Sequence, residues 1–366
     1  MSQNSNRIIF IDLMRAFAVF MMIQGHTVDT FLADEYRTFD SLFYSIWYFM
    51  RGFTAPIFMF TSGLIFTYLL KVNSFNFSDN PRVIKGIKRG LLLITIGYLL
   101  RYPTYRIFDF RYVSSEQWTI FFTVDALHLI GFGLLFIILV YYLSQKVNIN
   151  FNLVAIAFIF VIFILTPIME NLNWNYYLPE YISAYLTTKN GSLFPFFPWL
   201  IYVLAGGLLG NFLRNNELKY LQKRFVFAFF SIGIIFISFS ITIDFFSGFE
   251  DNKIYYNLSL WSIIFLRIGA VSILNAIIVS IARKAKKIPE IIMEIGRKTL
   301  LLYVVHLIIL YGCVLMPGLN KFYGKSFDVT QTLIAAALML ISMFSLILIT
   351  NKINNIRSKK LVYEKI

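Results

Sequence analysis

Four ionisable residues lie within one otherwise apolar segment near the amino terminus, "IDLMRAFAVFMMIQGHTVD" (11–29). Arg15 and His26 are far apart in sequence, but on an α-helix their separation is ~16 Å of rise and about 20° beyond three full turns, so both side chains share one face. Asp12 and Asp29 each lie three residues from one of them, a spacing at which helical side chains meet. The segment therefore predicts two polar stations at different depths of one helix.

These residue types fit group transfer. A guanidinium such as that of Arg15 stays charged and offers forked donors to phosphate groups. A neutral histidine such as His26 takes a proton from a hydroxyl or amine, and a carboxylate such as Asp29 fixes its tautomer. The residues also allow a structural alternative, in which Asp12 and Arg15 form an ion pair near the interface and His26 bonds to a carbonyl group.

Composition places this helix in a membrane. Of the 366 residues, 58% are hydrophobic and only 14% are charged. Apolar runs of about 18–25 residues recur, and at ~1.5 Å per residue they cross a ~30 Å hydrocarbon core. We predict an all-α polytopic membrane protein with one transmembrane domain over residues 1–366 and about ten membrane-spanning helices. The expected spans are 8–32, 51–70, 84–100, 120–143, 151–168, 197–213, 225–246, 260–282, 297–316 and 329–350.

The loops predict the orientation of these spans. Because positively charged loops stay cytoplasmic, the distribution of Lys and Arg predicts that both termini are cytoplasmic. The net charge of +14 then reflects topology and the anionic inner leaflet, and no nucleic acid partner is expected. The lone Cys313 excludes an intramolecular disulfide, and no Cys/His spacing resembles a metal site. We expect a multi-pass protein of the bacterial plasma (inner) membrane that contains no metal.

Ionisable residues inside the other spans mark further candidate sites, because each costs ~2.5–3.5 kcal/mol at a helix centre for Asp, Lys or Arg. Asp125 and His128 lie three residues apart in the expected span 120–143. Arg267 is expected to pair with a buried carboxylate, for which Asp125 is the candidate. His306 is expected to line a cavity, with a satisfied core histidine as the alternative. The small residues of "GGLLG" (206–210) predict close helix packing.

The spacing from arginine to histidine, preceded by "IDLMRAFAVF", resembles the start of the acyltransferase-3 type of integral-membrane acyltransferases. The related group that includes heparan-α-glucosaminide N-acetyltransferase looks similar too. Ser62 lies in a segment where Pro56 and Gly63 either loosen the helix to line a cavity or form a packing kink. Further segments agree with the resemblance in order: "RGFTAPIFMFTSG" (51–63), "VDALHLIGFGLL" (124–135), "FPFFPWLIYVLAGGLLG" (194–210) and "IGRKTLLLYVVH" (295–306).

Members of these families take an acyl group, commonly acetyl, from cytosolic acyl-CoA and deliver it to an acceptor, usually a sugar, at the outer face. The resemblance implies that Arg15 binds the donor and that His26 is the catalytic base or acyl carrier. Two departures stand out: Ala16 replaces a common glycine, and the first external loop (33–49) lacks the histidine that heparan-type enzymes use. The second departure weakens an amino-sugar acceptor specifically.

The sequence thus predicts a membrane acyltransferase with acetyl-CoA as donor substrate and a carbohydrate as acceptor. A proton-coupled small-molecule transporter is the alternative, because intramembrane Asp, His and Arg also form proton relays, although the repeated halves typical of transporters are missing. A membrane scaffold with a decayed site is a third reading. The candidate residues are His26, Asp29, Asp125 and His128 for catalysis; Arg15, Asp12, Lys88 and Arg89, with Arg82 and Lys85, for acyl-CoA; and Arg267, His306 and Ser62 for the acceptor.

Overall fold

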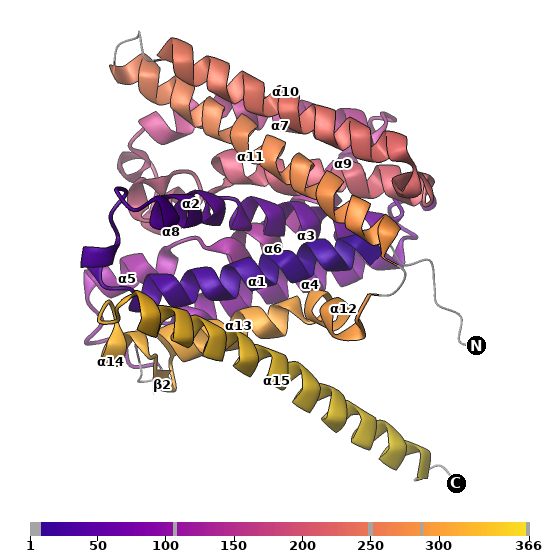
Figure 1. Ribbon diagram of the computed structural model, residues 1–366. Helices are drawn as coiled ribbons and strands as arrows, with labels where there is room; N and C mark the ends of the chain where they lie inside the picture. Colours follow the sequence, from indigo (N-terminus) through magenta and orange to yellow (C-terminus); the bar gives the residue numbers. More distant parts are fainter. Residues whose placement is uncertain (1–8, 105–107, 248–251, 286–287, 364–366) are drawn as a thin grey trace. The chain divides into compact units, whose positions relative to one another are not determined.

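The computed structural model describes residues 9–104, 108–247, 252–285 and 288–363. Most of the described chain is helical, with two short strands, as the prediction of an all-α membrane protein requires (Figure 1). Contacts divide the chain into two compact units. Unit 1 contains residues 1–10 and 55–285, and unit 2 contains residues 11–54 and 286–366. The prediction of a single domain stays a prediction.

Unit 1 is an assembly of helices joined by short connections. Within it, α10 (Lys223–Ser247) lies along α11 (Asn252–Lys284), as the two ribbons show (Figure 1). The helices α4 (Pro81–Leu100) and α6 (Ala126–Lys146) pack together, and so do α7 (Phe151–Asn171) and α9 (Phe196–Asn215). Ser240 on α10 and Ser262 on α11 hydrogen-bond through their hydroxyls at 2.8 Å. The helices are α3 (Thr54–Leu70), α4 (Pro81–Leu100), α5 (Ser115–Phe122), α6 (Ala126–Lys146), α7 (Phe151–Asn171), α8 (Glu180–Ser183), α9 (Phe196–Asn215), α10 (Lys223–Ser247) and α11 (Asn252–Lys284), with 3-10 turns η2 (Trp174–Tyr176), η3 (Thr188–Asn190) and η4 (Lys219–Leu221).

The close packing predicted for "GGLLG" is confirmed. A methyl group on Gly206 of α9 would overlap the Phe60 carbonyl of α3, and one on Gly63 of α3 would overlap the Val203 carbonyl of α9. Glycine at these positions therefore lets the two backbones touch, which is how membrane helices gain contact when no hydrophobic effect drives them together.

Unit 2 contains almost all of α1 (Ile9–Phe31) and the carboxyl-terminal helices. A bridge between Leu32 and Phe327 joins the end of α1 to the segment before the last helix. Gly312 ends α13 with φ +88, a left-handed conformation that suits glycine. The other elements are η1 (Asp34–Tyr36), α2 (Leu42–Arg51), α12 (Glu290–Arg297), α13 (Thr299–Tyr311), β1 (Gly312–Cys313), β2 (Met316–Pro317), α14 (Asn320–Tyr323) and α15 (Val329–Tyr363).

All ten expected spans correspond to helices, but their lengths and compositions differ from the prediction. Among the described residues, eight helical segments are long and apolar enough to cross a membrane. The expected span 84–100 is the helix α4, whose basic first half keeps it out of these eight. The expected span 297–316 is shorter than predicted, because α13 ends at Tyr311.

The expected span 120–143 is wrong in one respect that matters for the site. The chain is not helical at residues 123–125, and α6 begins at Ala126 with Asp125 as its N-cap. The Asp125 carboxylate accepts hydrogen bonds from the backbone N–H groups of Leu127 and His128. A side chain predicted within a helix thus caps its start, since Asp at this position satisfies amides that no helical carbonyl reaches.

Candidate active site

His26 of α1 lies in a cluster of ring side chains within unit 2. Its Nδ1 is 3.3 Å from the Tyr311 hydroxyl, and its ring centroid is 5.4 Å from that of His306. His26 is partly exposed, whereas His306 is fully buried. Of the two imidazoles, His26 is therefore the one that a substrate can touch.

The tautomer of His306 follows from its hydrogen bond. Nδ1 lies 2.8 Å from the Leu302 carbonyl oxygen, which only accepts, so the neutral ring carries its proton on Nδ1. The lone pair of Nε2 is then free, and Nε2 is buried without a hydrogen-bond partner among the described residues. His306 places an unused basic nitrogen in this ring cluster. No sequence pattern predicts that His26 and His306 meet, because they are distant in the chain.

Asp29 does not take the partner that the helical spacing predicts. Its carboxylate forms an ion pair with Arg51, at the end of α2, and not with His26. Arg37 donates from Nη2 to the Asp29 carbonyl oxygen at 2.7 Å. Arg51 also lies over the Trp47 ring, 5.7 Å from its centroid. Two cations that follow α1 in sequence thus hold its carboxyl-terminal end, and a charged guanidinium is a stronger partner for the carboxylate than an uncharged imidazole.

The other polar station of α1 packs against α12. Asp12 is buried and Arg15 is partly exposed. Gly296 of α12 touches the α1 backbone, because a methyl group there would overlap the Asp12 carbonyl. This contact fixes the start of α1 and leaves the Arg15 side chain partly accessible.

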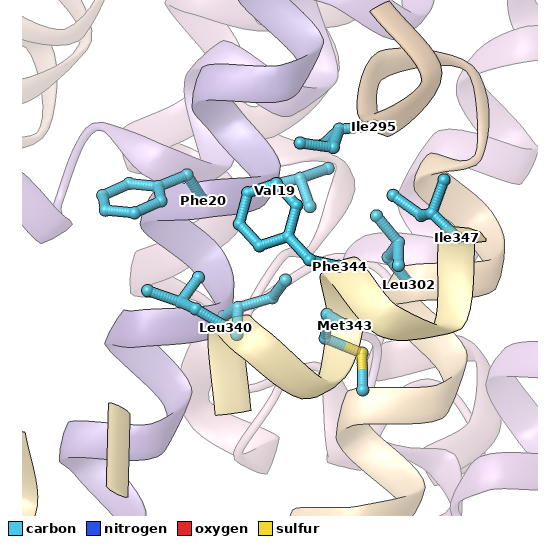
Figure 2. Close-up of a pocket in the computed structure, with 9 residues that line it drawn as sticks. Val19, Phe20, Ile295, Leu302, Leu340, Met343, Phe344 and Ile347 are labelled. Atoms are coloured by element: carbon cyan, nitrogen blue, oxygen red, sulfur yellow. The ribbon is translucent and has the colours of Figure 1, made fainter. Parts of the chain in front are cut away.

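An apolar pocket lies along the face of α1 between the two stations (Figure 2). Val19 and Ile23 of α1 line it, together with Leu302 of α13 and Met343 of α15. All of its lining residues are apolar. Leu302 also provides the carbonyl that fixes His306, so the pocket adjoins the ring cluster.

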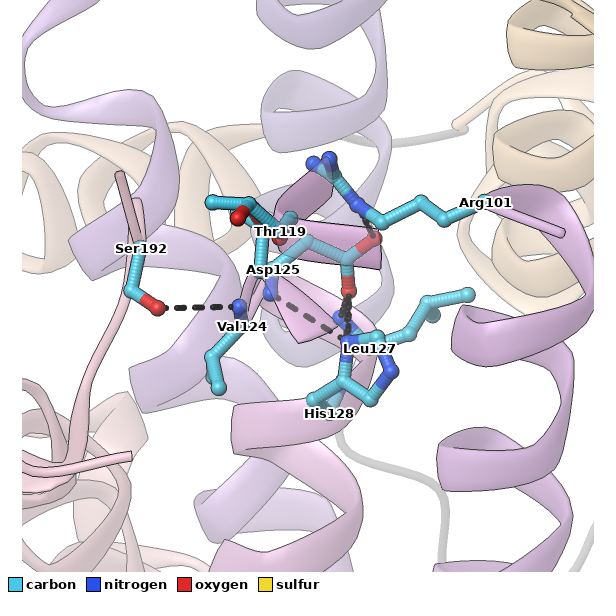
Figure 3. Close-up of polar contacts among 8 residues, drawn as sticks. Arg101, Thr119, Val124, Asp125, Leu127, His128 and Ser192 are labelled. Atoms are coloured by element: carbon cyan, nitrogen blue, oxygen red, sulfur yellow. Dashed lines mark hydrogen bonds and ion pairs between the residues drawn. The ribbon is translucent and has the colours of Figure 1, made fainter. Parts of the chain in front are cut away.

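Asp125 and His128 form a second cluster, within unit 1 (Figure 3). The His128 Nδ1 lies 2.9 Å from the Asp125 Oδ1, as the spacing of three residues predicts. Its Nε2 is buried and, within the described ranges, has no hydrogen-bond partner. The Arg101 Nε lies 3.4 Å from the other carboxylate oxygen of Asp125. The pair is thus an imidazole oriented by a carboxylate, which is the arrangement of a general base and its orienting group.

Two tyrosines that sequence reasoning missed pack on this pair. The Tyr98 ring meets the His128 ring edge-on with centroids 4.3 Å apart, and its hydroxyl is 2.8 Å from that of Tyr185. Burial raises the pKa of the Tyr185 phenol, and the hydrogen bond with Tyr98 raises it further, so this hydroxyl stays protonated. No sequence signal links these residues, because the loop that carries Tyr185 comes from far along the chain.

The expected pairing of Arg267 with Asp125 is wrong. The Arg267 guanidinium lies over the Trp199 ring, 4.4 Å from its centroid. Asp125 instead binds His128 and Arg101. An aromatic face thus takes the place of the carboxylate beside this intramembrane cation.

One comparison with known proteins finds a match. The family model of the heparan-alpha-glucosaminide N-acetyltransferase catalytic region matches residues 7–243. The chain belongs to this family. No curated protein and no solved structure matches the chain. The match supports the heparan-type group of the two resemblances described above and leaves the acyltransferase-3 type without support.

Membership of the heparan-alpha-glucosaminide N-acetyltransferase family identifies an integral, multi-pass membrane protein of an acetyltransferase class. The matched segment contains Arg15, His26 and the Asp125–His128 pair and ends before Arg267 and His306. The family is one of enzymes, so the match gives no support to the transporter reading.

The remaining candidate residues of this family member are exposed or bond within their own helix. Lys88 and Arg89 are exposed on α4. The Ser62 hydroxyl donates to the Phe58 carbonyl at 2.8 Å within α3, a bond that already satisfies it. Among the described residues, no group of three His, Cys, Asp or Glu side chains is placed to hold a metal ion.

Proposed function

We propose that the protein transfers an acetyl group from cytosolic acetyl-CoA to a carbohydrate of the cell envelope at the outer face of a bacterial plasma membrane. The family supports acetyl transfer across a membrane. The observation that carries the proposal is the face of α1. One face of this helix carries, at helical spacing, the cation Arg15, the pocket-lining Val19 and Ile23, and the base His26. A cation, an apolar wall and a base thus form one continuous stripe.

The donor end of this stripe is Arg15. We assign the phosphates of acetyl-CoA to its guanidinium, because a forked, permanently charged donor suits phosphate oxygens. The exposed Lys88 and Arg89 add positive charge on the same side in the predicted topology. The apolar pocket between the stations then suits the less polar arm of the donor, which carries the thioester.

His26 is the group that we assign to the chemistry. Its imidazole takes a proton from the acceptor hydroxyl or amine, the freed oxygen or nitrogen attacks the thioester carbonyl carbon, and the carbon–sulfur bond breaks. The imidazolium returns the proton to the departing thiolate, so the enzyme ends as it began. A covalent acetyl-histidine is the second route, and its ping-pong kinetics distinguish it from direct transfer.

His306 and Tyr311 act through His26 in this scheme. The buried His306 does not meet a substrate, and it holds a basic nitrogen beside the reacting ring. The Tyr311 hydroxyl, 3.3 Å from the His26 Nδ1, orients that ring. Both are positioning residues.

The experiment is acetyl transfer in membrane vesicles from cells that produce the protein, where native acceptors are present. Acetyl-labelled acetyl-CoA is added, and label in glycans is counted. We expect His26→Ala to lower the rate ~10²–10⁴-fold, the usual contribution of a positioned general base. The matched control is Gln24→Ala, which removes a polar residue that faces Trp47 from the same helix. Equal rates in His26→Ala and wild type would overturn the assignment.

A further inference from the structure

Arg267 is an intramembrane cation for which the described residues provide no counter-ion. It lies within α11, in a segment apolar enough to span a membrane. In the part of the chain that the structure describes, no carboxylate lies within ion-pair distance of its guanidinium, and its close partner is the face of Trp199. The contact with Trp199 uses the face of the guanidinium, and its N–H donors point outward in its plane, toward groups other than the ring.

A second unused polar group lies beside it. The Tyr202 side chain is buried, and its O–H donates to no acceptor among the described residues. Tyr202 lies one helical turn after Trp199 on α9, and the Arg267 guanidinium is close enough to act on its hydroxyl oxygen both as a charge and as a hydrogen-bond donor. A buried O–H without an acceptor is costly, so this phenol, beside a guanidinium with no carboxylate among the described residues, indicates a site for an anionic ligand.

This donor pair connects to the Asp125–His128 cluster of the same unit. The Trp199 ring packs edge-on against Phe194 at 4.7 Å. The Phe194 backbone N–H donates to the Val124 carbonyl at 3.1 Å, one residue before Asp125. The Trp199 ring beside Arg267 is thus joined, through Phe194, to the segment that carries the carboxylate–imidazole pair.

We propose that Arg267 and Tyr202 bind an anionic group of the acceptor glycan, a carboxylate or a phosphate, with Trp199 as the wall of the site. The inference rests on the proposed function for the identity of the ligand as the acceptor. Arginine suits such a group because its forked N–H donors match two oxygens of a carboxylate or a phosphate, and the phenol supplies a further donor. The acceptor is an acidic sugar or a sugar phosphate, and a neutral sugar binds more weakly.

The test measures the thermal unfolding of the purified protein with glucuronate, glucose 1-phosphate or glucose at matched ionic strength. We expect one or both anionic sugars to raise the midpoint and glucose to have a smaller effect. A rise with glucuronate alone would show that the site binds a carboxylate, and a rise with glucose 1-phosphate alone would show that it binds a phosphate. Arg267→Gln abolishes the shift, whereas Arg214→Gln, which removes a cation paired with Glu217 in the same unit, keeps it.

Three results would overturn the site: no shift with any of the sugars, an equal shift with glucose, or an undiminished shift in Arg267→Gln. Should Arg267→Gln fail to fold, Tyr202→Phe removes the second donor alone and is expected to weaken anion binding several-fold. Acetyl-CoA is tested separately in the same variants. If the anionic sugars raise the midpoint but no acetyl group is transferred, the proposed function is rejected. If acetyl transfer occurs but the anionic sugars do not raise the midpoint, this site is rejected.

Discussion

Replacing Gly97 by alanine is expected to displace the His128 ring while leaving the imidazole itself intact. The new methyl group would lie 2.7 Å from Cε1 and 2.8 Å from Nε2 of His128. Ordinary carbon contacts are about 3.5–4.0 Å, so the ring has to move by roughly 1 Å. That movement breaks the 2.9 Å bond between the His128 Nδ1 and Asp125, since hydrogen bonds weaken steeply beyond their usual length.

A misplacement of about 1 Å at a site costs on the order of 10²-fold in rate. We therefore expect Gly97→Ala to lower acetyl transfer on that order, with binding of acetyl-CoA unchanged. The matched control is Gly86→Ala in the same helix, whose methyl group would lie 2.6 Å from Phe66 and 2.9 Å from Ile138, away from the pair. Both variants lose ~1–3 kcal/mol of stability by overpacking, partly offset by ~0.8–1.0 kcal/mol of helix propensity.

The assay is label transfer in vesicles, with the amount of folded protein measured for each variant. Lower transfer in Gly97→Ala than in Gly86→Ala, at similar thermal stability, supports a role for the Asp125–His128 pair in the reaction. Equal rates in the two variants would refute it and leave the pair as the cap of α6.

Three further predictions concern the helices and the ring cluster. Gly206→Ala is expected to lower the free energy of unfolding by ~1–3 kcal/mol more than Gly207→Ala, because the first meets a backbone carbonyl and the second a threonine hydroxyl at 3.1 Å; equal thermal midpoints would contradict the close packing of α3 and α9. Tyr311→Phe is expected to slow transfer by about threefold to tenfold, the loss of one hydrogen bond of ~0.5–1.5 kcal/mol, and an unchanged rate would remove its orienting role. Arg51→Ala is expected to destabilise the protein by stranding the half-buried carboxylate, and adding Asp29→Asn is expected to restore part of the loss; a double variant as unstable as the sum would show that the ion pair does not couple them.

Helical periodicity predicted the parts of the site that depend on one helix. The spacing of Arg15 and His26 placed both side chains on one face, and the structure puts an apolar pocket wall between them. The spacing of Asp125 and His128 likewise predicted their contact. Such pairs are local, so a spacing of three residues brings them within reach, although Asp29 shows that a charged partner can replace the predicted contact.

Sequence reasoning failed where partners come from distant segments or where local capping competes with a helix. It did not predict that His306 lies beside His26. It predicted that Asp29 contacts His26, whereas the structure pairs Asp29 with Arg51 of α2. The break before α6 did have a local signal, because Asp125 followed three residues later by His128 suits a capping box. No such local signal linked Arg267 to Trp199, because tryptophan is common near membrane interfaces whether or not it contacts a cation.

The proposed function requires that the protein binds acetyl-CoA at the Arg15 station, and one measurement tests this binding without any acceptor. The thermal unfolding of the purified protein is followed with acetyl-CoA and with free CoA, in wild type, Arg15→Ala and the control Arg214→Ala. Binding to the folded state stabilises it by ~2.7 kcal/mol at a hundred times the dissociation constant. We predict that acetyl-CoA raises the midpoint of the wild type and of the control, and that this rise is lost in Arg15→Ala. No rise with either ligand, or an equal rise in all three proteins, would contradict it.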